Sequence, residues 1–362
     1  MIRPNFVFTL FTSLILGLGL GTSISPAQAQ PTALNLISEI KGNVSLKRSQ
    51  WKDFKKANVG DLLNVSDQLK LEAGASATVL CNNLKVWNVP NNKATLVSDG
   101  CGTGGLVAMQ GNASLIRSRG NAQLYILSPR NTHVFTERPL FRWSSVPEAK
   151  KYTVQLIENG TEPVWQAETD KTEIEYPGQP AIKPEVQYWL VINTDNGVSS
   201  SAPSPQFKRL TPEKSQLLQS QIQQIQAQKL PPEVEALAMA HLYRVYDLNA
   251  EAIELLEAQV KRGKSGSPSY ATYKLLGETY RQVGLTQEAE ATYLQALRLA
   301  QQTNDVSAQA EIQYQLGDIQ LDLNNLPEAK KLMLQSQKSY QDLGDSAKTQ
   351  EIDQLLQEIG HK

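Results

Sequence analysis

The sequence predicts a multidomain protein with an all-β N-terminal half followed by an all-α helical solenoid. All five Trp lie at or before position 189, within short alternating segments that are separated by Gly, Asn, Pro and Asp. A region rich in Gln, Leu and Ala begins after about position 212, and a helical unit recurs within it three times. The 362 residues suffice for two or three domains with sizeable cores.

Charge and composition exclude several classes of function. The formal net charge is −1, so the chain has no basic excess to bind nucleic acid or anionic lipid. No Gly-x-Ser-x-Gly motif or paired-His motif is present, and the three histidines are not at metal-ligand spacing. We therefore expect a protein that is not an enzyme and that binds neither a cofactor nor a metal.

Residues 1–29 have the features of a signal peptide. Arg3 precedes an apolar core from Phe6 to Leu20, and Ala27-Gln28-Ala29 places small residues at the two cleavage-site positions. We expect cleavage after Ala29. No later segment is long and apolar enough to span a bilayer, so the mature chain is expected to be soluble, exported, and periplasmic or associated with the cell envelope.

The two cysteines, Cys81 and Cys101, form an even pair in a chain that we expect to reach an oxidising compartment. This context favours a disulfide, and the alternative is two buried thiols. A metal site would need two further ligands, which the sequence does not place nearby.

The first β region, residues 34–120, shows period-two alternation with frequent turns, which is typical of a small sheet or barrel. It resembles the FecR-like domain of bacterial envelope proteins. The matching residues are Gly42, Val44, Gly60, Asp61, Leu63, Asp67, Leu69, Gly74, Ala77 and Val79.

The second β region covers residues 125–208. Phe141 and Trp143 share one strand face, and the alternation that starts at Tyr152 predicts a partner strand. This region resembles a fibronectin type III or immunoglobulin-like sandwich. The cysteine pair of immunoglobulin domains is absent, which points to the fibronectin-like variant.

A connecting amphipathic helix is expected over residues 211–230. Thr211-Pro212-Glu213 has the pattern of a helix start, with an N-cap hydroxyl, Pro in the first turn and an acidic residue near the dipole. Leu217, Leu218, Ile222 and Ile225 form one apolar stripe that requires a covering surface.

The recurring unit occupies residues 233–263, 270–301 and 310–339, within a region that runs from 233 to 362. In each copy two helical stretches flank a short turn, and a small residue in the first helix lies twelve positions before an Ala in the second. These repeat-packing residues are Ala240 and Ala252, Gly277 and Ala289, and Gly317 and Ala329. Close approach of two antiparallel helices requires small side chains where the helices cross. Residues 345–359 read as a capping helix.

The unit resembles the tetratricopeptide repeat (TPR), and the second copy carries the resemblance most fully. Its matching residues are Leu276, Gly277, Tyr280, Ala289, Tyr293 and Ala296. The resemblance implies protein binding in a groove lined by the first helices. The residues expected to line the groove are His241, Arg244, Lys274, Glu278, Arg281, Tyr314 and Asp318. Because the first two copies present mainly cations, they suit an extended segment with an acidic end.

Two hypotheses about function follow. The first is an exported adaptor that binds a protein partner, of unknown identity, through the repeats, with the β modules as spacers or second binding surfaces. The alternative is an envelope protein that binds polysaccharide or peptidoglycan through the β domains. A protein recovered on the repeats would favour the first hypothesis, and retention of the β half on cell wall would favour the second.

Overall fold

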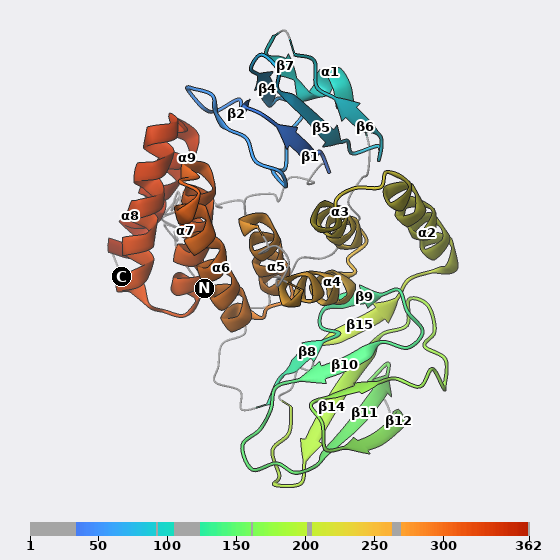
Figure 1. Cartoon of the computed structure of the whole chain (residues 1–362). Helices are drawn as coiled ribbons and strands as arrows, with labels where there is room; N and C mark the ends of the chain where they lie inside the picture. Colours follow the sequence, from blue (N-terminus) through green and yellow to red (C-terminus); the bar gives the residue numbers. More distant parts are fainter. Residues whose placement is uncertain are drawn as a thin grey trace, which may run out of the picture. The chain divides into compact units, whose positions relative to one another are not determined.

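The computed structural model describes residues 34–91, 93–104, 124–160, 162–200, 205–262 and 269–360 (Figure 1). The predicted signal peptide lies outside the described residues, and so does the end of the first predicted β region, from residue 105 onward. The N-terminal half is rich in sheet and the C-terminal half is helical.

The first β unit consists of two antiparallel sheets. Strand order is β1-β5-β6 in one sheet and β3-β2-β4-β7 in the other. The alternating residues pair as buried partners: Val44 lies opposite Leu71, and Leu46 lies opposite Leu69. The strands are β1 (Leu36–Lys41), β2 (Val44–Lys47), β3 (Lys55–Lys56), β4 (Gln68–Leu71), β5 (Ser76–Leu80), β6 (Val86–Asn88) and β7 (Thr95–Leu96).

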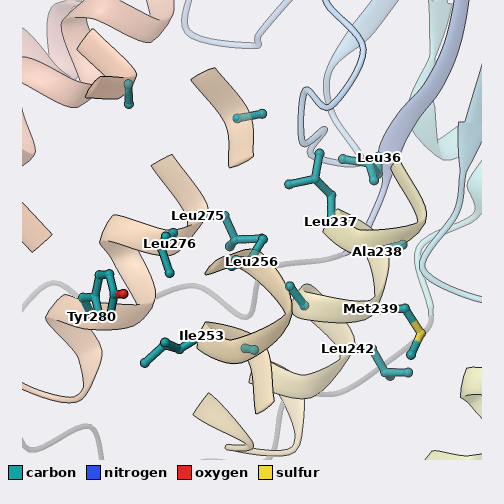
Figure 2. Packing of buried hydrophobic residues seen from close by; sticks show 14 of the residues in the cluster. Leu36, Leu237, Ala238, Met239, Leu242, Ile253, Leu256, Leu275, Leu276 and Tyr280 are labelled. Carbon is teal, nitrogen blue, oxygen red and sulfur yellow. The ribbon is translucent and has the colours of Figure 1, made fainter. Parts of the chain in front are cut away.

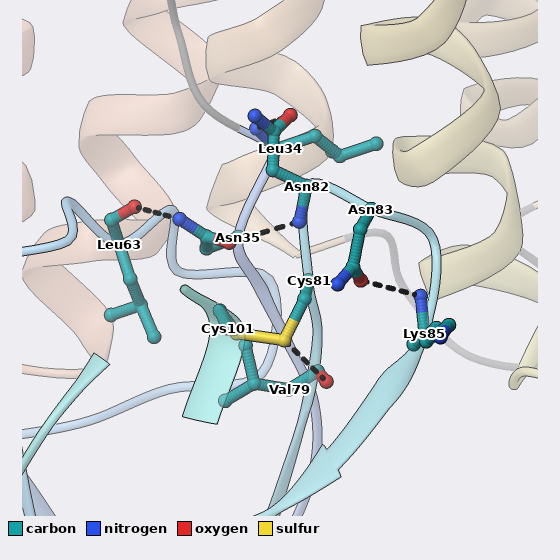
Figure 3. Close-up of a disulfide and its surroundings, with 9 residues drawn as sticks. All are labelled: Leu34, Asn35, Leu63, Val79, Cys81, Asn82, Asn83, Lys85 and Cys101. Atoms are coloured by element: carbon teal, nitrogen blue, oxygen red, sulfur yellow. Dashed lines mark hydrogen bonds between the residues drawn. A yellow bond between two sulfur atoms is a disulfide. The ribbon is translucent and has the colours of Figure 1, made fainter. Parts of the chain in front are cut away.

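The N-terminal half, which was predicted to be all β, contains one short helix. Helix α1 (Val97–Cys101) follows β7, and it carries one of the two cysteines. The structure joins Cys81 to Cys101 in a disulfide with a Cα–Cα distance of 5.1 Å (Figure 3). Beside it, the backbone amide of Asn82 donates to Oδ1 of Asn35 at 2.9 Å, which ties this loop to the start of β1.

The second β unit also has two sheets, with strand orders β13-β10-β8 and β12-β11-β14-β15-β9. Its core is aromatic: Phe141, Trp143, Tyr176, Tyr188 and Phe207 are all almost fully buried. The strands are β8 (Ile126–Ser128), β9 (Thr132–Val134), β10 (Leu140–Trp143), β11 (Tyr152–Glu158), β12 (Pro163–Thr169), β13 (Glu173–Glu175), β14 (Tyr188–Thr194) and β15 (Gln206–Arg209).

Helix α2 (Pro212–Ala227) connects the β half to the helical half. The Thr211 hydroxyl caps it by accepting a hydrogen bond from the backbone amide of Lys214 at 3.3 Å, and Pro212 occupies the first turn. Leu218 and Ile225 are buried in the same apolar cluster as the next helix, α3. The predicted stripe is thus covered along one side only, because Leu217 remains exposed.

The remaining helices form the repeat array, in which pairs of helices follow one another along the chain. The turn inside each pair contains one residue with positive φ, namely Asp247, Gly284 or Asn324. The helices are α3 (Pro232–Val245), α4 (Asn249–Lys261), α5 (Tyr270–Gln282), α6 (Thr286–Gln302), α7 (Val306–Asp322), α8 (Leu326–Leu343) and α9 (Ser346–Gly360).

The small residues expected at the helix crossings are in the interior of the array. Ala240, Ala252, Ala289 and Ala329 are fully buried. A β-carbon at Gly277 would lie 3.1 Å from three ring atoms of Tyr293, and one at Gly317 would lie 3.0 Å from Cε of Met333. In both repeats the larger partner comes sixteen positions after the glycine, on the second helix. The glycine therefore makes room for a specific large side chain.

The apolar interior of the array is shared with the first β unit. Leu34, Leu36, Leu80 and Leu84 belong to the cluster that holds the buried residues of α3 to α7. Figure 2 shows Leu237 of α3 pointing toward Leu36 of β1. A second cluster joins the interior of the first β unit to Tyr340, Leu343 and Ile352 of α8 and α9.

Candidate functional site

Charged side chains follow one surface of the first helix of each repeat. On α5, Lys274, Glu278 and Arg281 are spaced at i, i+4 and i+7, so they lie on one side of the helix. On α7, Glu311 and Asp318 are likewise seven residues apart. The same spacing therefore presents one charged row on the first helix of each of two successive repeats.

These rows bond to each other from helix to helix. Nη1 of Arg244 on α3 lies 2.9 Å from Oε2 of Glu278 on α5. Nζ of Lys274 lies 3.1 Å from Oε1 of the same Glu278 and 2.8 Å from Oε1 of Glu311 on α7. The first helices of three successive repeats, α3, α5 and α7, are thus linked through a single chain of ion pairs.

A second set of contacts also joins α5 to α7. The Arg281 guanidinium forms an ion pair with Asp318, and its Nη1 donates to Oε1 of Gln315 at 2.8 Å. Its Nη2 lies 3.7 Å from Oδ2 of Asp322. Arg281 therefore holds three acceptor groups of the following repeat.

A third set joins α7 to α9. The Tyr314 hydroxyl donates to Oε1 of Glu351 at 2.7 Å. Nζ of Lys348 lies 2.8 Å from that oxygen and 4.1 Å from the centre of the Tyr314 ring, which is cation–π geometry. We call the members of these three sets the charge ladder, and their surface the ladder face. The ladder consists of Arg244, Lys274, Glu278, Arg281, Glu311, Tyr314, Gln315, Asp318, Asp322, Lys348 and Glu351.

Glu278 and Lys274 at the centre of the ladder are both charged at neutral pH. Burial alone would raise the pKa of Glu278, but the nearby Lys274 and Arg244 hold this pKa at about 2. Burial also opposes the charge of Lys274, yet Glu278 and Glu311 raise the pKa of its ammonium above its usual range. Glu278 and Lys274 therefore each keep their charge because the other is charged.

Six of the seven residues predicted to line a groove belong to the ladder, and His241 does not. The His241 side chain is buried within α3. Burial, with a further contribution from Arg244, lowers its pKa to about 3, so the imidazole is neutral at physiological pH. The cations of this surface are therefore Arg244, Lys274 and Arg281, and His241 adds no positive charge.

The pairing of these cations argues against the predicted ligand, an extended segment with an acidic end. That expectation required cations without partners, whereas Arg244, Lys274 and Arg281 are each paired with a carboxylate of the array. The sequence does contain the signal for this pairing. Arg244 and Glu278 are 34 residues apart, and Arg281 and Asp318 are 37 apart, so opposite charges recur at about one repeat length.

The sequence did not indicate the contacts between the β half and the repeats. The Tyr270 hydroxyl of α5 donates to Oδ1 of Asp61, a residue of the first β unit, at 2.5 Å. The Asn58 side chain donates to Oδ2 of Asp305, the N-cap residue of α7, at 2.7 Å. Burial raises the pKa of Asp61 to about 6, although its donors Tyr270 and Asn58 oppose that rise.

The second β unit contacts the turns of the first two repeats. The Thr132 hydroxyl donates to the carbonyl of Asp247 at 2.6 Å, and Nε of Arg130 donates to the carbonyl of Val283 at 2.7 Å. Glu251 of α4 accepts from the backbone amide of Phe135 at 2.6 Å. Both β units therefore bond directly to the repeat array.

Among the described residues, no group of three or more His, Cys, Asp and Glu side chains is arranged to hold a metal ion. The helices in the same residues include none with the length and apolar character needed to cross a membrane.

Comparison with known proteins identifies the central part of the array. Residues 269–342, which cover α5 to α7 and all but the last residue of α8, match the family model described as tetratricopeptide repeat. This match confirms the predicted repeat family for these residues, and arrays of this family are scaffolds for protein–protein interaction. No curated protein matches the sequence.

Several solved structures are similar over 41% of this chain. BtubC (BKLC) from P. vanneervenii is 16% identical, with 73% of its own chain covered and a TM-score of 0.30. MamA is 17% identical, with 92% covered and a TM-score of 0.28. The Podosopora anserina putative kinesin light chain, with nearly identical TPR-like repeats, is 22% identical, with 89% covered and a TM-score of 0.27.

Proposed function

We propose that the protein is an exported, non-enzymatic adaptor that binds a protein partner through the ladder face of its repeats. The observation that carries this proposal is the tetratricopeptide repeat match over residues 269–342, in which the first helices present charged side chains on one surface. Stacked helix pairs of this kind offer an extended surface to a partner. The ladder adds a fixed pattern of charge, because its ion pairs hold each side chain in place.

The β units serve as spacers or second binding surfaces in this proposal. We assign residues 34–120 to a FecR-like domain and residues 125–208 to a fibronectin-like sandwich. The paired buried strands β2 and β4 support the first assignment, and the aromatic interior around Trp143 supports the second. Export is supported by the apolar segment before Ala29 and by the Cys81–Cys101 pair, because such pairs persist in oxidising compartments.

Polysaccharide binding through the β units remains the alternative. Trp165 is a poor candidate for a sugar platform, because its ring packs edge-on against Tyr176 with centroids 5.2 Å apart. Trp189 is partly accessible on β14, so it is the Trp through which the alternative would be tested.

Site-specific photo-crosslinking of the full chain in intact cells tests the proposal. A photoreactive phenylalanine replaces Tyr314 on the ladder face in one variant and Leu294 in the other. Leu294 is 45% exposed on α6, a helix that contributes nothing to the ladder. We expect a discrete protein adduct from position 314 and none from position 294. Retention on purified cell wall that depends on Trp189, with no protein adduct at position 314, would support the alternative and contradict the proposal.

A further inference from the structure

The accessibility of the ladder indicates what kind of partner fits it. Within each ion pair of the ladder the cation is less exposed than its carboxylate: side-chain exposure is 19% for Arg244 against 22% for Glu278, 17% for Lys274, 15% for Arg281 and 29% for Lys348. The carboxylates of Glu311 and Glu351 are 40% and 42% exposed. A molecule that approaches the ladder face therefore meets oxygen atoms before it meets nitrogen atoms.

The formal charges of the ladder also sum to a negative value. The ladder contains five carboxylates, at Glu278, Glu311, Asp318, Asp322 and Glu351, and four cations, at Arg244, Lys274, Arg281 and Lys348. The buried His241 adds no charge at neutral pH. The surface is therefore slightly anionic, and its most accessible groups are its anions.

An acidic segment and a basic segment would have different effects on the ladder. An acidic segment has to displace resident carboxylates from Lys274 and Arg281, which leaves those carboxylates without their cations. A basic segment can add a cation to a carboxylate that is already paired, because each carboxylate accepts several hydrogen bonds. The ion pair of Glu311 to Lys274 uses Oε1, so a second donor can approach without breaking it.

The array also contains a buried hydroxyl without a hydrogen bond, close to the ladder. The Tyr293 side chain is fully buried, and its hydroxyl has no hydrogen-bond partner among the described residues. The charges that act on this hydroxyl include those of Glu278, Arg281 and Glu311, so it lies close to the ladder. A phenol oxygen accepts hydrogen bonds from ammonium and guanidinium groups, and leaving it unpaired in the interior is destabilising.

We propose that the ladder face recognises an extended, lysine- and arginine-rich segment of the partner protein. Charge complementarity with Glu311, Asp318 and Glu351 supplies the selectivity for this segment. The inference rests on the proposed function, because it names the partner chemistry of the same surface.

The test measures fluorescence anisotropy of labelled synthetic peptides with the full chain lacking its predicted signal peptide. One peptide alternates Lys and Ser, and a second of equal length alternates Glu and Ser. We expect the basic peptide to bind about tenfold or more tightly than the acidic one, and added salt to weaken its binding. Removal of residues 1–29 removes Arg3 and leaves a net charge of −2, so general attraction contributes little. Equal or tighter binding of the acidic peptide would overturn the inference.

Matched variants assign the binding to the ladder. Glu311→Gln with Glu351→Gln removes the two most accessible carboxylates of the ladder, and Glu328→Gln with Asp342→Asn removes two exposed carboxylates of α8. We expect the first pair to weaken binding of the basic peptide about five- to tenfold and the second to leave it unchanged. Equal losses in the two double variants would overturn the inference.

The photo-crosslinking at position 314 separates failure of this inference from failure of the proposed function. A protein adduct whose crosslinked segment is acidic or neutral would overturn the inference and leave the adaptor proposal intact. A crosslinked segment rich in Lys and Arg would support both. The lack of any protein adduct would contradict the adaptor proposal, and with it the inference.

Discussion

Gly277 of α5 leaves room for the ring of Tyr293 on α6, because a β-carbon at position 277 would stand 3.1 Å from three of the ring atoms. Gly317 bears the same relationship to Met333 in the next repeat. The two sites share backbone setting and spacing, and they differ in the stiffness of the partner side chain.

This difference predicts opposite responses to alanine. Ala adds about 1 kcal/mol of helix propensity at either site. At Gly277 the neighbour is the rigid, fully buried ring of Tyr293, and overpacking of about 1–3 kcal/mol outweighs the gain. At Gly317 the flexible Met333 side chain can shift. Urea unfolding should show Gly277→Ala destabilised by about 1 kcal/mol and Gly317→Ala unchanged or stabilised; equal effects would contradict the steric account.

Loss of the disulfide should destabilise the first β unit. Cys81 and Cys101 are 20 residues apart in sequence, and closing a loop of that length contributes about 3 kcal/mol. The Cys81→Ala, Cys101→Ala double variant and the reduced native chain should therefore both unfold at lower urea concentration. Mass spectrometry of unreduced exported protein should show one linked peptide pair, whereas two alkylatable thiols would rule out the bridge.

Asp61 should make stability fall as pH rises. Burial raises its pKa in the folded state to about 6, above the unfolded value of 3.8, so the folded chain binds the proton more tightly. The native state consequently loses stability as pH rises from about 4 to about 6. Asp61→Asn lacks this titration. Thermal melts should therefore show that its free energy of unfolding rises by about 1–2 kcal/mol relative to the native chain across that range. This figure is reduced from the full value of the pKa shift because the Asp61 side chain is only partly buried. Asp53→Asn, an exposed carboxylate of the same unit, should show no such gain.

Arg130 should anchor the second β unit to the repeats. Its side chain is buried, and its Nε donates to the carbonyl of Val283 in the turn of the second repeat. Arg130→Met leaves that carbonyl without its partner and should cost about 2 kcal/mol. The control is Arg138→Met, because Arg138 is exposed in an ion pair with Glu175 and should change stability by less than about 0.5 kcal/mol. Similar losses in the two variants would refute an anchoring role.

The repeats were predictable because their packing is local. Small and aromatic residues recur at fixed spacing, and each helix pair folds from about thirty consecutive residues. Six of the seven residues predicted to line the groove also belong to the ladder, because helical periodicity places them on one face of the first helices. Their pairing was missed, although Lys274 and Glu311 lie about one repeat apart and carry opposite charges.

The junctions between the β half and the repeats could not be predicted in this way. Tyr270 and Asp61 are 209 residues apart, and Arg130 and Val283 are 153 apart. No local pattern marks such pairs, because their proximity is set by the docking of folded units. Helix α1 was missed for a related reason: five residues that include Gly and Asp have little helix propensity of their own.

The most direct test of the account is the affinity of the crosslinked partner for two charge-reversal variants of the full chain. Glu311→Lys reverses a ladder carboxylate, and Glu328→Lys reverses one of nearly equal exposure on α8. With circular dichroism confirming that both fold, we predict at least about tenfold weaker binding for Glu311→Lys and native affinity for Glu328→Lys. Native affinity in Glu311→Lys would contradict the claim that the ladder face holds the partner.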